Sequence, residues 1–371
     1  MATQLALFAL GIVALVAGAG LLVRGASRLA LALGISPLVV GLTVVAFGTS
    51  APELAVSVGA AMRGNTDIAV GNVVGSNIFN VLFILGVSAL IAPLVVNAQI
   101  VRQEVPVMIV ASLGLAAAAW NGVIGYVDGA VFLAALAGYT VFLVVQARRQ
   151  SPETLDEYAG ATGAGRMRGS APLQLVLVAG GLALLVLGSR WLVGSAVHFA
   201  KAAGVSETVV GLTIVAAGTS LPEVAASIAA TLRGERDIAV GNVIGSCTFN
   251  ILGCLGLSAL VAPAGLPVAP SILTFDLWVM VATAIACVPV FATGYRVARW
   301  EGVVFVAYYV AYTAYLVLAA QQHDALPRYS AAMMAFVVPL TVLTMGIVLV
   351  RDRRSLRPRA GARTASSIRT N

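Results

Sequence analysis

The feature that most constrains this chain is an internal duplication. Residues 41–93 recur as residues 211–263 at a constant offset of 170, with 34 identities in 53 positions and no gap. Two unrelated apolar segments would match at Val, Leu or Ala, but here Gly, Thr, Ser, Pro, Glu, Asp and Asn are also repeated in place. The chain is therefore predicted to contain two copies of one structural unit.

Both copies lie within long apolar runs. The chain is 60% hydrophobic and only 10% charged, whereas soluble domains average about 45–50% apolar and about 25% charged residues. The apolar runs reach roughly 20 residues, which is the length of helix that crosses about 30 Å of hydrocarbon. A transmembrane β-barrel would instead alternate polar and apolar residues along each strand. These features predict an all-α polytopic membrane protein.

Turn residues divide the apolar sequence into eleven predicted spans, of which the first and sixth are long enough to be tilted. Their approximate bounds are 3–33, 37–62, 68–92, 104–121, 124–146, 172–202, 207–232, 238–262, 272–293, 299–319 and 331–350. The second copy begins five spans after the first, and an odd number of spans inserts it the other way up. We therefore expect two inverted five-helix repeats plus one extra C-terminal transmembrane helix.

This organisation divides the chain into four parts. The first repeat is predicted at 1–146, a cytoplasmic linker at 147–171, the second repeat at 172–320, and the extra helix with a basic cytoplasmic tail at 321–371. With the N-terminus outside, 18 of the 22 Lys and Arg residues fall on the inner side, as in other multi-pass inner-membrane proteins. The net charge of +7 then follows from membrane topology, and no nucleic-acid partner is expected.

One glutamate of each copy, Glu53 or Glu223, falls well inside a span. A charged side chain at the bilayer centre costs at least about 2.5 kcal/mol on insertion scales, so its presence there requires a reason. No Lys or Arg lies within 37–62 or 207–232 to neutralise these acids. The two glutamates therefore predict a site for cations that enter from solution.

Each glutamate directly follows a proline, in the sequences GTSAPE (48–53) and GTSLPE (218–223). Proline has no N–H to donate and displaces the preceding helical turn. Pro52 and Pro222 are therefore expected to leave the carbonyls of Gly48 and Gly218 without helical partners. Free carbonyls are tolerated in a bilayer where they line a cavity or bind a ligand.

Hydroxyl and amide groups accompany the glutamates at helical spacing. Thr49 and Ser50 precede Glu53 by four and three residues, so their hydroxyls can share its helix face. The next span of each copy carries a serine and an asparagine four residues apart, namely Ser76 with Asn80 and Ser246 with Asn250. Carboxylate, hydroxyl, amide and carbonyl oxygens suit Na⁺, Ca²⁺ or Mg²⁺ rather than zinc or copper.

Other polar residues of the spans are interpreted as structural. Asn72 and Asn242 are expected to join helices by hydrogen bonds rather than to bind ions. Cys247, Cys254 and Cys287 lie inside apolar stretches and predict neither a disulfide framework nor a thiolate metal site.

The paired segments GTSxPE and GNVxGSxxFN resemble those of the calcium:cation antiporter superfamily, and specifically its bacterial sodium/calcium exchanger branch. The two duplicated blocks that carry the resemblance cover about 106 of the 371 residues. In the proton/calcium branch the corresponding helix typically has GN before the glutamate instead of GTS, which favours sodium. The family core has ten helices, so the span at 331–350 is not explained by the resemblance.

The resemblance implies a ligand set that both copies share. Glu53 and Glu223 would be the central ligands for calcium and sodium, and Asn80 and Asn250 would complete the middle of the site. Flanking sodium ligands would be the hydroxyls of Thr49, Ser50, Ser76, Thr219, Ser220 and Ser246 and the backbone carbonyls of Ala46 and Ala216. Archaeal relatives and the potassium-dependent branch tend to carry an acid at the position of Asn250, so its absence argues against potassium co-transport.

The expected function is secondary active antiport of Ca²⁺ against Na⁺, with the long first and sixth spans sliding over the rest to alternate access. No enzymatic activity, no cofactor and no obligatory protein partner are expected; the partners are the two ions and the lipid bilayer. A Ca²⁺/H⁺ antiporter that uses the same glutamates is the nearest alternative. A cation channel fits an inverted repeat less well, and an intramembrane protease would need a Ser–His or Asp–Asp pair, which His198 does not provide.

Overall fold

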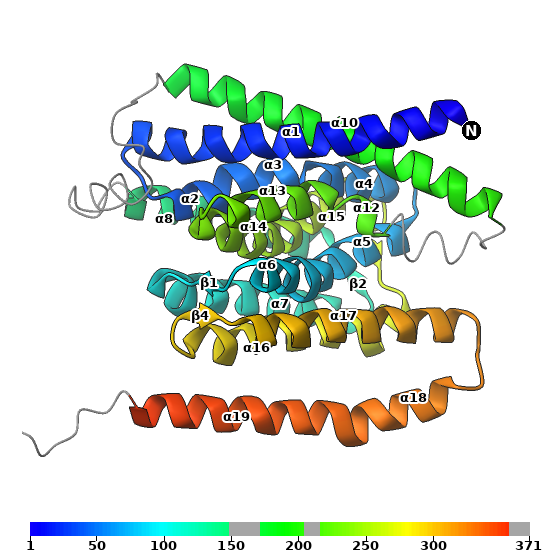
Figure 1. The fold of residues 1–371 in the computed structure, drawn as a ribbon. Coiled ribbons are helices and arrows are strands. Elements are labelled where there is room, and N and C mark those ends of the chain that lie inside the picture. Colours follow the sequence, from blue (N-terminus) through cyan, green and yellow to red (C-terminus); the bar gives the residue numbers. More distant parts are fainter. Residues whose placement is uncertain (148–170, 204–215, 356–371) are drawn as a thin grey trace, which may run out of the picture.

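The computed structural model describes residues 1–147, 171–203 and 216–355, and nearly all of them are helical (Figure 1). Most of the predicted linker and the end of the basic tail lie outside these described residues. Within them, nine helices are long and apolar enough to cross a membrane, and one bent pair of helices makes a tenth candidate span. The predicted all-α polytopic fold is confirmed.

The first half of the chain begins with a long helix and continues through shorter, partly broken ones. Its α-helices are α1 (Ala2–Leu33), α2 (Pro37–Val40), α3 (Ala46–Thr49), α4 (Ala51–Met62), α5 (Thr66–Phe79), α6 (Gly86–Ile91), α7 (Val105–Ala118) and α8 (Tyr126–Ala147). Its π-helical or 3₁₀ turns and its strands are η1 (Gly41–Val45), η2 (Asn80–Leu85), η3 (Ile100–Glu104), η4 (Ala119–Asn121), β1 (Leu94–Val95) and β2 (Val123–Ile124).

The second half repeats this order and ends with the extra helix. Its α-helices are α10 (Ala171–Ala202), α12 (Ala216–Gly218), α13 (Leu221–Leu232), α14 (Arg236–Phe249), α15 (Gly256–Val261), α16 (Leu277–Ala292), α17 (Arg299–Ala320), α18 (Leu326–Ala332) and α19 (Val338–Ser355). Its π-helical turns and strands are η6 (Asn250–Leu255), η7 (Ile272–Asp276), η8 (Met333–Val337), β3 (Leu266–Pro267) and β4 (Arg296–Val297).

Ten of the eleven predicted spans coincide with these candidate spans, with ends that differ by a few residues. The remaining prediction, 207–232, lies partly outside the described residues. From Ala216 onward it consists of α12 and α13, which repeat the arrangement of α3 and α4.

The predicted interruption at each proline is present in both halves. The segment Pro37–Thr49 meets α4 at an angle of 46°. Ser50 lies between them with φ −80° and ψ 6°, and Ser220 has nearly the same backbone angles, φ −87° and ψ 7°, before α13. Proline is well tolerated in the first turn of a helix because that N–H has no helical partner anyway. Pro52 and Pro222 thus begin new helices, each with its glutamate in the first turn.

The two longest helices, α1 and α10, cross each other along one side of the molecule (Figure 1). Glycines at the crossing bring the backbones into direct contact. A Cβ added at Gly18 would lie 2.8 Å from the carbonyl oxygen of Gly181, and one added at Gly11 would lie 2.9 Å from that of Gly188. Beneath them, α4 and α13 lead to the buried helices α5 and α14. The α19 helix lies at the opposite edge (Figure 1).

Two short antiparallel strand pairs join the halves. β1 pairs with β4, with Leu94 opposite Val297, and β2 pairs with β3, with Ile124 opposite Leu266. The alternation of the predicted spans assigns the loops that hold β1 and β4 to one membrane face, and those that hold β2 and β3 to the other. Each observed pair therefore joins two loops that the span count had assigned to the same face.

A third buried glutamate, Glu104, serves as a structural contact away from the two central acids. It is fully buried at the junction of η3 and α7. Its Oε1 accepts hydrogen bonds from the side-chain amides of Gln99 and Gln103, both at 2.8 Å, and its Oε2 accepts from the hydroxyl of Tyr139 on α8. Both of its oxygens therefore have hydrogen-bond partners, whereas each central glutamate has one oxygen without a partner.

The extra C-terminal helix is attached through tyrosines. The hydroxyl of Tyr308 on α17 donates to Oγ1 of Thr341 at 2.7 Å, and the hydroxyl of Tyr329 donates to the carbonyl oxygen of Ala311 at 2.7 Å. These bonds lie between α17 and the α18–α19 segment, so they hold the extra helix against the tenth predicted span and leave the central helices untouched.

Candidate cation-binding site

The two intramembrane glutamates are joined across the inverted halves. Oε1 of Glu53 accepts a hydrogen bond from the hydroxyl of Ser220 at 2.7 Å, and Oε1 of Glu223 accepts one from the hydroxyl of Ser50 at 2.9 Å. All four side chains are fully buried. Each serine precedes one glutamate by three residues and yet serves the glutamate of the other half. Ser50 was expected to share a helix face with Glu53, but its hydroxyl bonds to Glu223 of the other half instead.

The second oxygen of each carboxylate has no partner. Oε2 of Glu53 and Oε2 of Glu223 are buried and lack any hydrogen bond. Among the described residues, no lysine or arginine side chain pairs with either carboxylate. A buried charge without a partner is strongly unfavourable, so each unbonded carboxylate oxygen requires an explanation, and a bound ion is one that suits an acid.

Two asparagines brace the glutamate helices from neighbouring helices. Asn72 on α5 donates from Nδ2 to the hydroxyl of Ser57 at 2.9 Å and to the carbonyl oxygen of Glu53 at 3.2 Å. Asn242 on α14 donates to the hydroxyl of Ser227 at 3.0 Å. Both asparagines therefore make the hydrogen bonds between helices that the sequence predicted.

The threonines of the two motifs complete the same symmetric pattern. The hydroxyl of Thr49 donates to Oδ1 of Asn242 at 3.0 Å, and that of Thr219 donates to Oδ1 of Asn72 at 3.4 Å. Each threonine, like each serine, bonds to a residue of the opposite half. Hydrogen bonds between the two inverted halves therefore surround both glutamates.

The serines of the second helix pair also lie beside the glutamate helices. The hydroxyl oxygens of Ser76 and Ser220 lie 3.3 Å apart, and Ser246 donates to the carbonyl oxygen of Ala46 at 3.5 Å. The Ala46 carbonyl also accepts from the backbone N–H of Ser50 at 3.0 Å. A cation that used this carbonyl would have to share it with these bonds. Ala216, its counterpart, begins α12 at the edge of the described residues.

The two central amides differ in their surroundings. Asn80 begins η2 and Asn250 begins η6, and both are fully buried. Neither polar atom of the Asn80 side chain has a hydrogen-bond partner. Asn250 instead donates from Nδ2 to Oδ1 of Asn77 at 3.2 Å and accepts at Oδ1 from the thiol of Cys254 at 3.6 Å. Wide π-helical turns of this kind are common at functional sites.

One expected free carbonyl is occupied. The carbonyl oxygen of Gly218, which Pro222 leaves without its helical partner, accepts a 2.6 Å hydrogen bond from the hydroxyl of Ser189 on α10. The expectation of a free carbonyl at Gly218 is therefore wrong. A hydroxyl from the crossing helix replaces the missing N–H, and the residue that corresponds to Ser189 in the first half is Ala19, which has no hydroxyl.

The sequence interpretation did not name Asn77, Ser57, Ser227 or Ser189. Ser57 and Ser227 lie four residues after their glutamates in both copies, so the duplication itself carried a signal for them. Asn77 carried no such signal, because its counterpart in the second copy is Cys247.

The donor set consists almost wholly of oxygens. Two carboxylates and the hydroxyls of serine and threonine meet where the halves join, and the buried amides of Asn80 and Asn250 begin the turns that follow α5 and α14. The described part of the chain contains no cluster of three or more His, Cys, Asp or Glu side chains that could hold a metal ion. The arrangement is suited to hard cations, with two formal negative charges and neutral oxygens around them.

The comparisons with known proteins agree with this architecture. The Methanosarcina acetivorans protein named sodium/calcium exchanger MaX1 is 33% identical over 275 residues, which cover 66% of this chain and 78% of that protein. The Escherichia coli inner membrane protein YrbG is 37% identical over 195 residues, which cover 52% of this chain and 60% of that protein. A solved structure of the sodium-calcium exchanger NCX_Mj has 31% identity and a TM-score of 0.72, and the match covers 84% of this chain and 98% of that one.

The model of the family described as sodium/calcium exchanger protein matches residues 3–145 and 173–318. These two segments contain both inverted copies and all the glutamate, serine and asparagine side chains described above, and they end before the extra C-terminal helix. The chain therefore belongs to the sodium/calcium exchanger family of multi-pass membrane transporters.

Proposed function

We propose that this chain exchanges Ca²⁺ for Na⁺ across the membrane as a secondary active antiporter. The observation that carries the proposal is the pair of unbonded carboxylate oxygens, one on Glu53 and one on Glu223, in a buried site with no resident cation side chain among the described residues. Ions from solution are the natural partners for these oxygens. The names of MaX1 and NCX_Mj as sodium/calcium exchangers support the same assignment.

Charge balance gives the exchange its physical basis. One Ca²⁺ neutralises two carboxylates, and several Na⁺ ions can do so with the help of the hydroxyls. Ser50 and Ser220 donate hydrogen bonds to the glutamates. A bound cation takes the place of these protons at the carboxylates, and the serine oxygens can then turn their lone pairs to it. Ca²⁺ and Na⁺ compete for the same oxygens, and this competition within one site couples the movement of one ion to that of the other.

The proposed ligand set is the one that the resemblance implies. Glu53 and Glu223 are the shared ligands, with Asn80 and Asn250 beside them. The proposed sodium ligands are Thr49, Ser50, Ser76, Thr219, Ser220, Ser246 and the carbonyls of Ala46 and Ala216. Asn80 has the strongest support among the neutral groups, because its Oδ1, the atom that could bind a cation, is buried without a hydrogen bond.

Alternating access is assigned to the crossed pair of α1 and α10. Close contacts at the glycines and packed side chains join these two helices to each other, so they would move as one unit. Sliding of this pair over α4 and α13 would open the site first to one face and then to the other. We place the protein in the inner membrane with the N-terminus outside and the C-terminus in the cytoplasm, as the distribution of Lys and Arg indicates.

The decisive experiment measures uptake of radioactive Ca²⁺ into proteoliposomes with Na⁺, K⁺ and H⁺ gradients imposed separately. We expect an outward Na⁺ gradient to drive uptake, and Glu53→Gln and Glu223→Gln each to abolish it. Glu104→Gln is the matched control, because this glutamate is also buried but has both oxygens bonded; it should retain Na⁺-driven uptake. Uptake that follows only the H⁺ gradient would identify the alternative Ca²⁺/H⁺ antiporter with the same two glutamates.

A further inference from the structure

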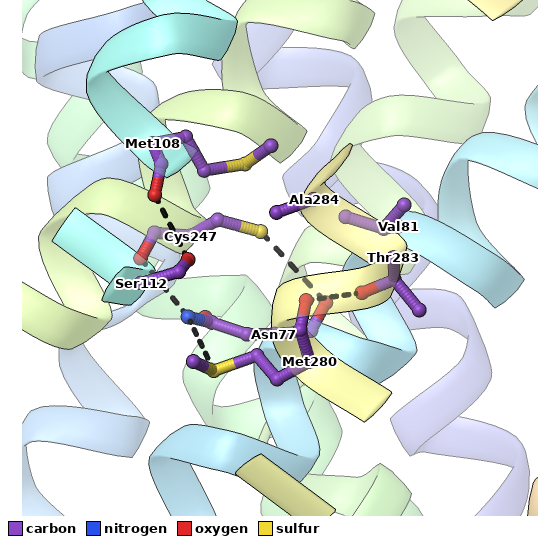
Figure 2. Close-up of a pocket in the computed structure, with 8 residues that line it drawn as sticks. All are labelled: Asn77, Val81, Met108, Ser112, Cys247, Met280, Thr283 and Ala284. Carbon is purple, nitrogen blue, oxygen red and sulfur yellow. Dashed lines mark hydrogen bonds between the residues drawn. The ribbon is translucent and has the colours of Figure 1, made fainter. Parts of the chain in front are cut away.

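A carboxamide outside the proposed ligand set, that of Asn77, lies between the two halves beside a small pocket (Figure 2). Asn77 is on α5 and only 3% exposed. Its Nδ2 donates to the carbonyl oxygen of Cys247 at 3.2 Å and approaches Sδ of Met280 at 3.7 Å. Its Oδ1 accepts from Nδ2 of Asn250 at 3.2 Å. Both ends of this buried amide therefore have partners.

These hydrogen bonds can run in one direction only. A backbone carbonyl cannot donate, so the end of Asn77 that faces Cys247 must be its NH₂ group. Oδ1 of Asn77 then faces Asn250, and because a carbonyl oxygen only accepts, Asn250 must present its own NH₂ group there. The oxygen of Asn250 is thereby turned to the other side of its amide, where the thiol of Cys254 donates to it at 3.6 Å.

The oxygen is the end of the Asn250 amide that is left to face a cation, because the NH₂ group is used by Asn77. The η6 turn, which Asn250 begins, packs against α4, the helix that carries Glu53. An amide oxygen has two lone pairs, and the thiol uses one of them. The other remains for a cation held by the glutamates.

The duplication supplies an internal comparison. Asn80 is the counterpart of Asn250 at the offset of 170, but neither of its polar atoms has a partner. The residues that hold Asn250 are not repeated, since Asn77 corresponds to Cys247 and Cys254 corresponds to Ile84. The protein thus holds Asn250 at both ends of its amide, whereas the amide of Asn80 makes no such pair of hydrogen bonds and lies beside the thiol of Cys247.

We propose that Asn77 is a positioning residue of the cation site, which fixes Asn250 so that an amide oxygen rather than an NH₂ group faces the bound ion. The proposal rests on the proposed function, because it requires Asn250 to be a ligand. When Asn77 is absent, the amide of Asn250 can turn over, and its NH₂ group then repels the cation. The loss falls on ion affinity, since Asn77 itself touches no ion.

The test is a double-mutant cycle on the full chain in proteoliposomes, in which the Ca²⁺ dependence of Na⁺-driven Ca²⁺ uptake is measured. Asn77→Leu should raise the KM for Ca²⁺ about three- to tenfold, the effect of one neutral hydrogen bond, with a much smaller change in maximal rate. In the Asn250→Ala background the same substitution should add no further change, because the group that it positions is gone. A KM unchanged by Asn77→Leu, or raised by the same factor in both backgrounds, would overturn the proposal.

Controls separate positioning from packing. Thr283 lines the same pocket, and its hydroxyl bonds only to the carbonyl oxygen of Met280 (Figure 2); Thr283→Val should leave the KM for Ca²⁺ unchanged. If Asn77→Leu fails to accumulate in membranes, Asn77→Cys, which copies the residue at the related position in the second repeat, takes its place in the cycle with the same expected result. Glu53→Gln distinguishes the two levels of failure. If Glu53→Gln still takes up Ca²⁺, the proposed function is wrong. If Glu53→Gln loses uptake but the Asn77 variant behaves as the wild type, only the positioning role of Asn77 is wrong.

Discussion

At the scale of single residues, each glutamate depends on a serine from the opposite repeat. The sequence was sufficient to predict Glu53 and Glu223 as the central pair, because a charge inside a span is costly and both copies retain it. It was not sufficient to predict that Ser50 bonds to Glu223 and Ser220 to Glu53. Helical spacing reports which residues share a face, but a crossed arrangement of two inverted copies depends on how the helices pack.

The serine exchange predicts equal effects of two distant substitutions. Ser50→Ala and Ser220→Ala each remove a hydroxyl that bonds one carboxylate, so each should lower the apparent affinity for Na⁺ by a similar factor, about three- to tenfold. The measurement is the Na⁺ dependence of Ca²⁺ uptake in proteoliposomes. Ser112→Ala is the control, because this buried hydroxyl bonds only to the carbonyl oxygen of Met108. A large loss in one serine variant and none in the other would contradict a symmetric role.

At the scale of helices, proline residues predicted where helices break, but the sequence did not predict how the helices pack. Pro52 and Pro222 led correctly to interrupted helices. The π-helical turns that begin at Asn80 and Asn250 had no sequence signal, because their wider hydrogen-bond spacing follows from the tertiary surroundings. The hydrogen bond from Ser189 to the Gly218 carbonyl could not be predicted either, because it depends on where α10 crosses the broken helix.

The crossing of α1 and α10 predicts a sharp difference between two adjacent glycines. A Cβ at Gly181 would lie 2.6 Å from the backbone nitrogen of Leu22, whereas a Cβ at Gly180 meets nothing within 4 Å. Gly181→Ala should force the helices apart, destabilise the protein by about 1–3 kcal/mol and slow exchange. Gly180→Ala should change neither property. Thermal unfolding in detergent and initial rates of Ca²⁺ uptake measure both effects, and equal behaviour of the two variants would exclude a tight crossing.

At the scale of the whole molecule, the count of spans predicted the inverted architecture because parity depends only on how many times the chain crosses the membrane. The strand pairs agree with that count, since each joins loops assigned to one face. The position of the extra helix was not predictable. Its apolar sequence indicates a span, but its place follows from packing against α16 and from hydrogen bonds made by Tyr308 and Tyr329.

The odd number of proposed spans predicts that removal of the last one inverts the side of the C-terminus. A reporter that is active only outside the cytoplasm should be inactive when fused after Asn371 and active when fused after Gln321. The chain that ends at Gln321 should still exchange Ca²⁺ for Na⁺, because it retains all of the matched family segments. Reporter activity in cells and uptake in proteoliposomes measure the two outcomes. The same reporter response at both positions would show that the extra helix does not cross the membrane.

The two strand pairs also restrict how such a carrier can work mechanically. Many transporters with inverted repeats rock one half as a rigid body against the other. Here β1–β4 clasps the halves at one rim and β2–β3 clasps them at the opposite rim, so a hinge at either rim would have to tear main-chain hydrogen bonds. A movement of α1 and α10, which contain none of these strands, would leave both pairs intact.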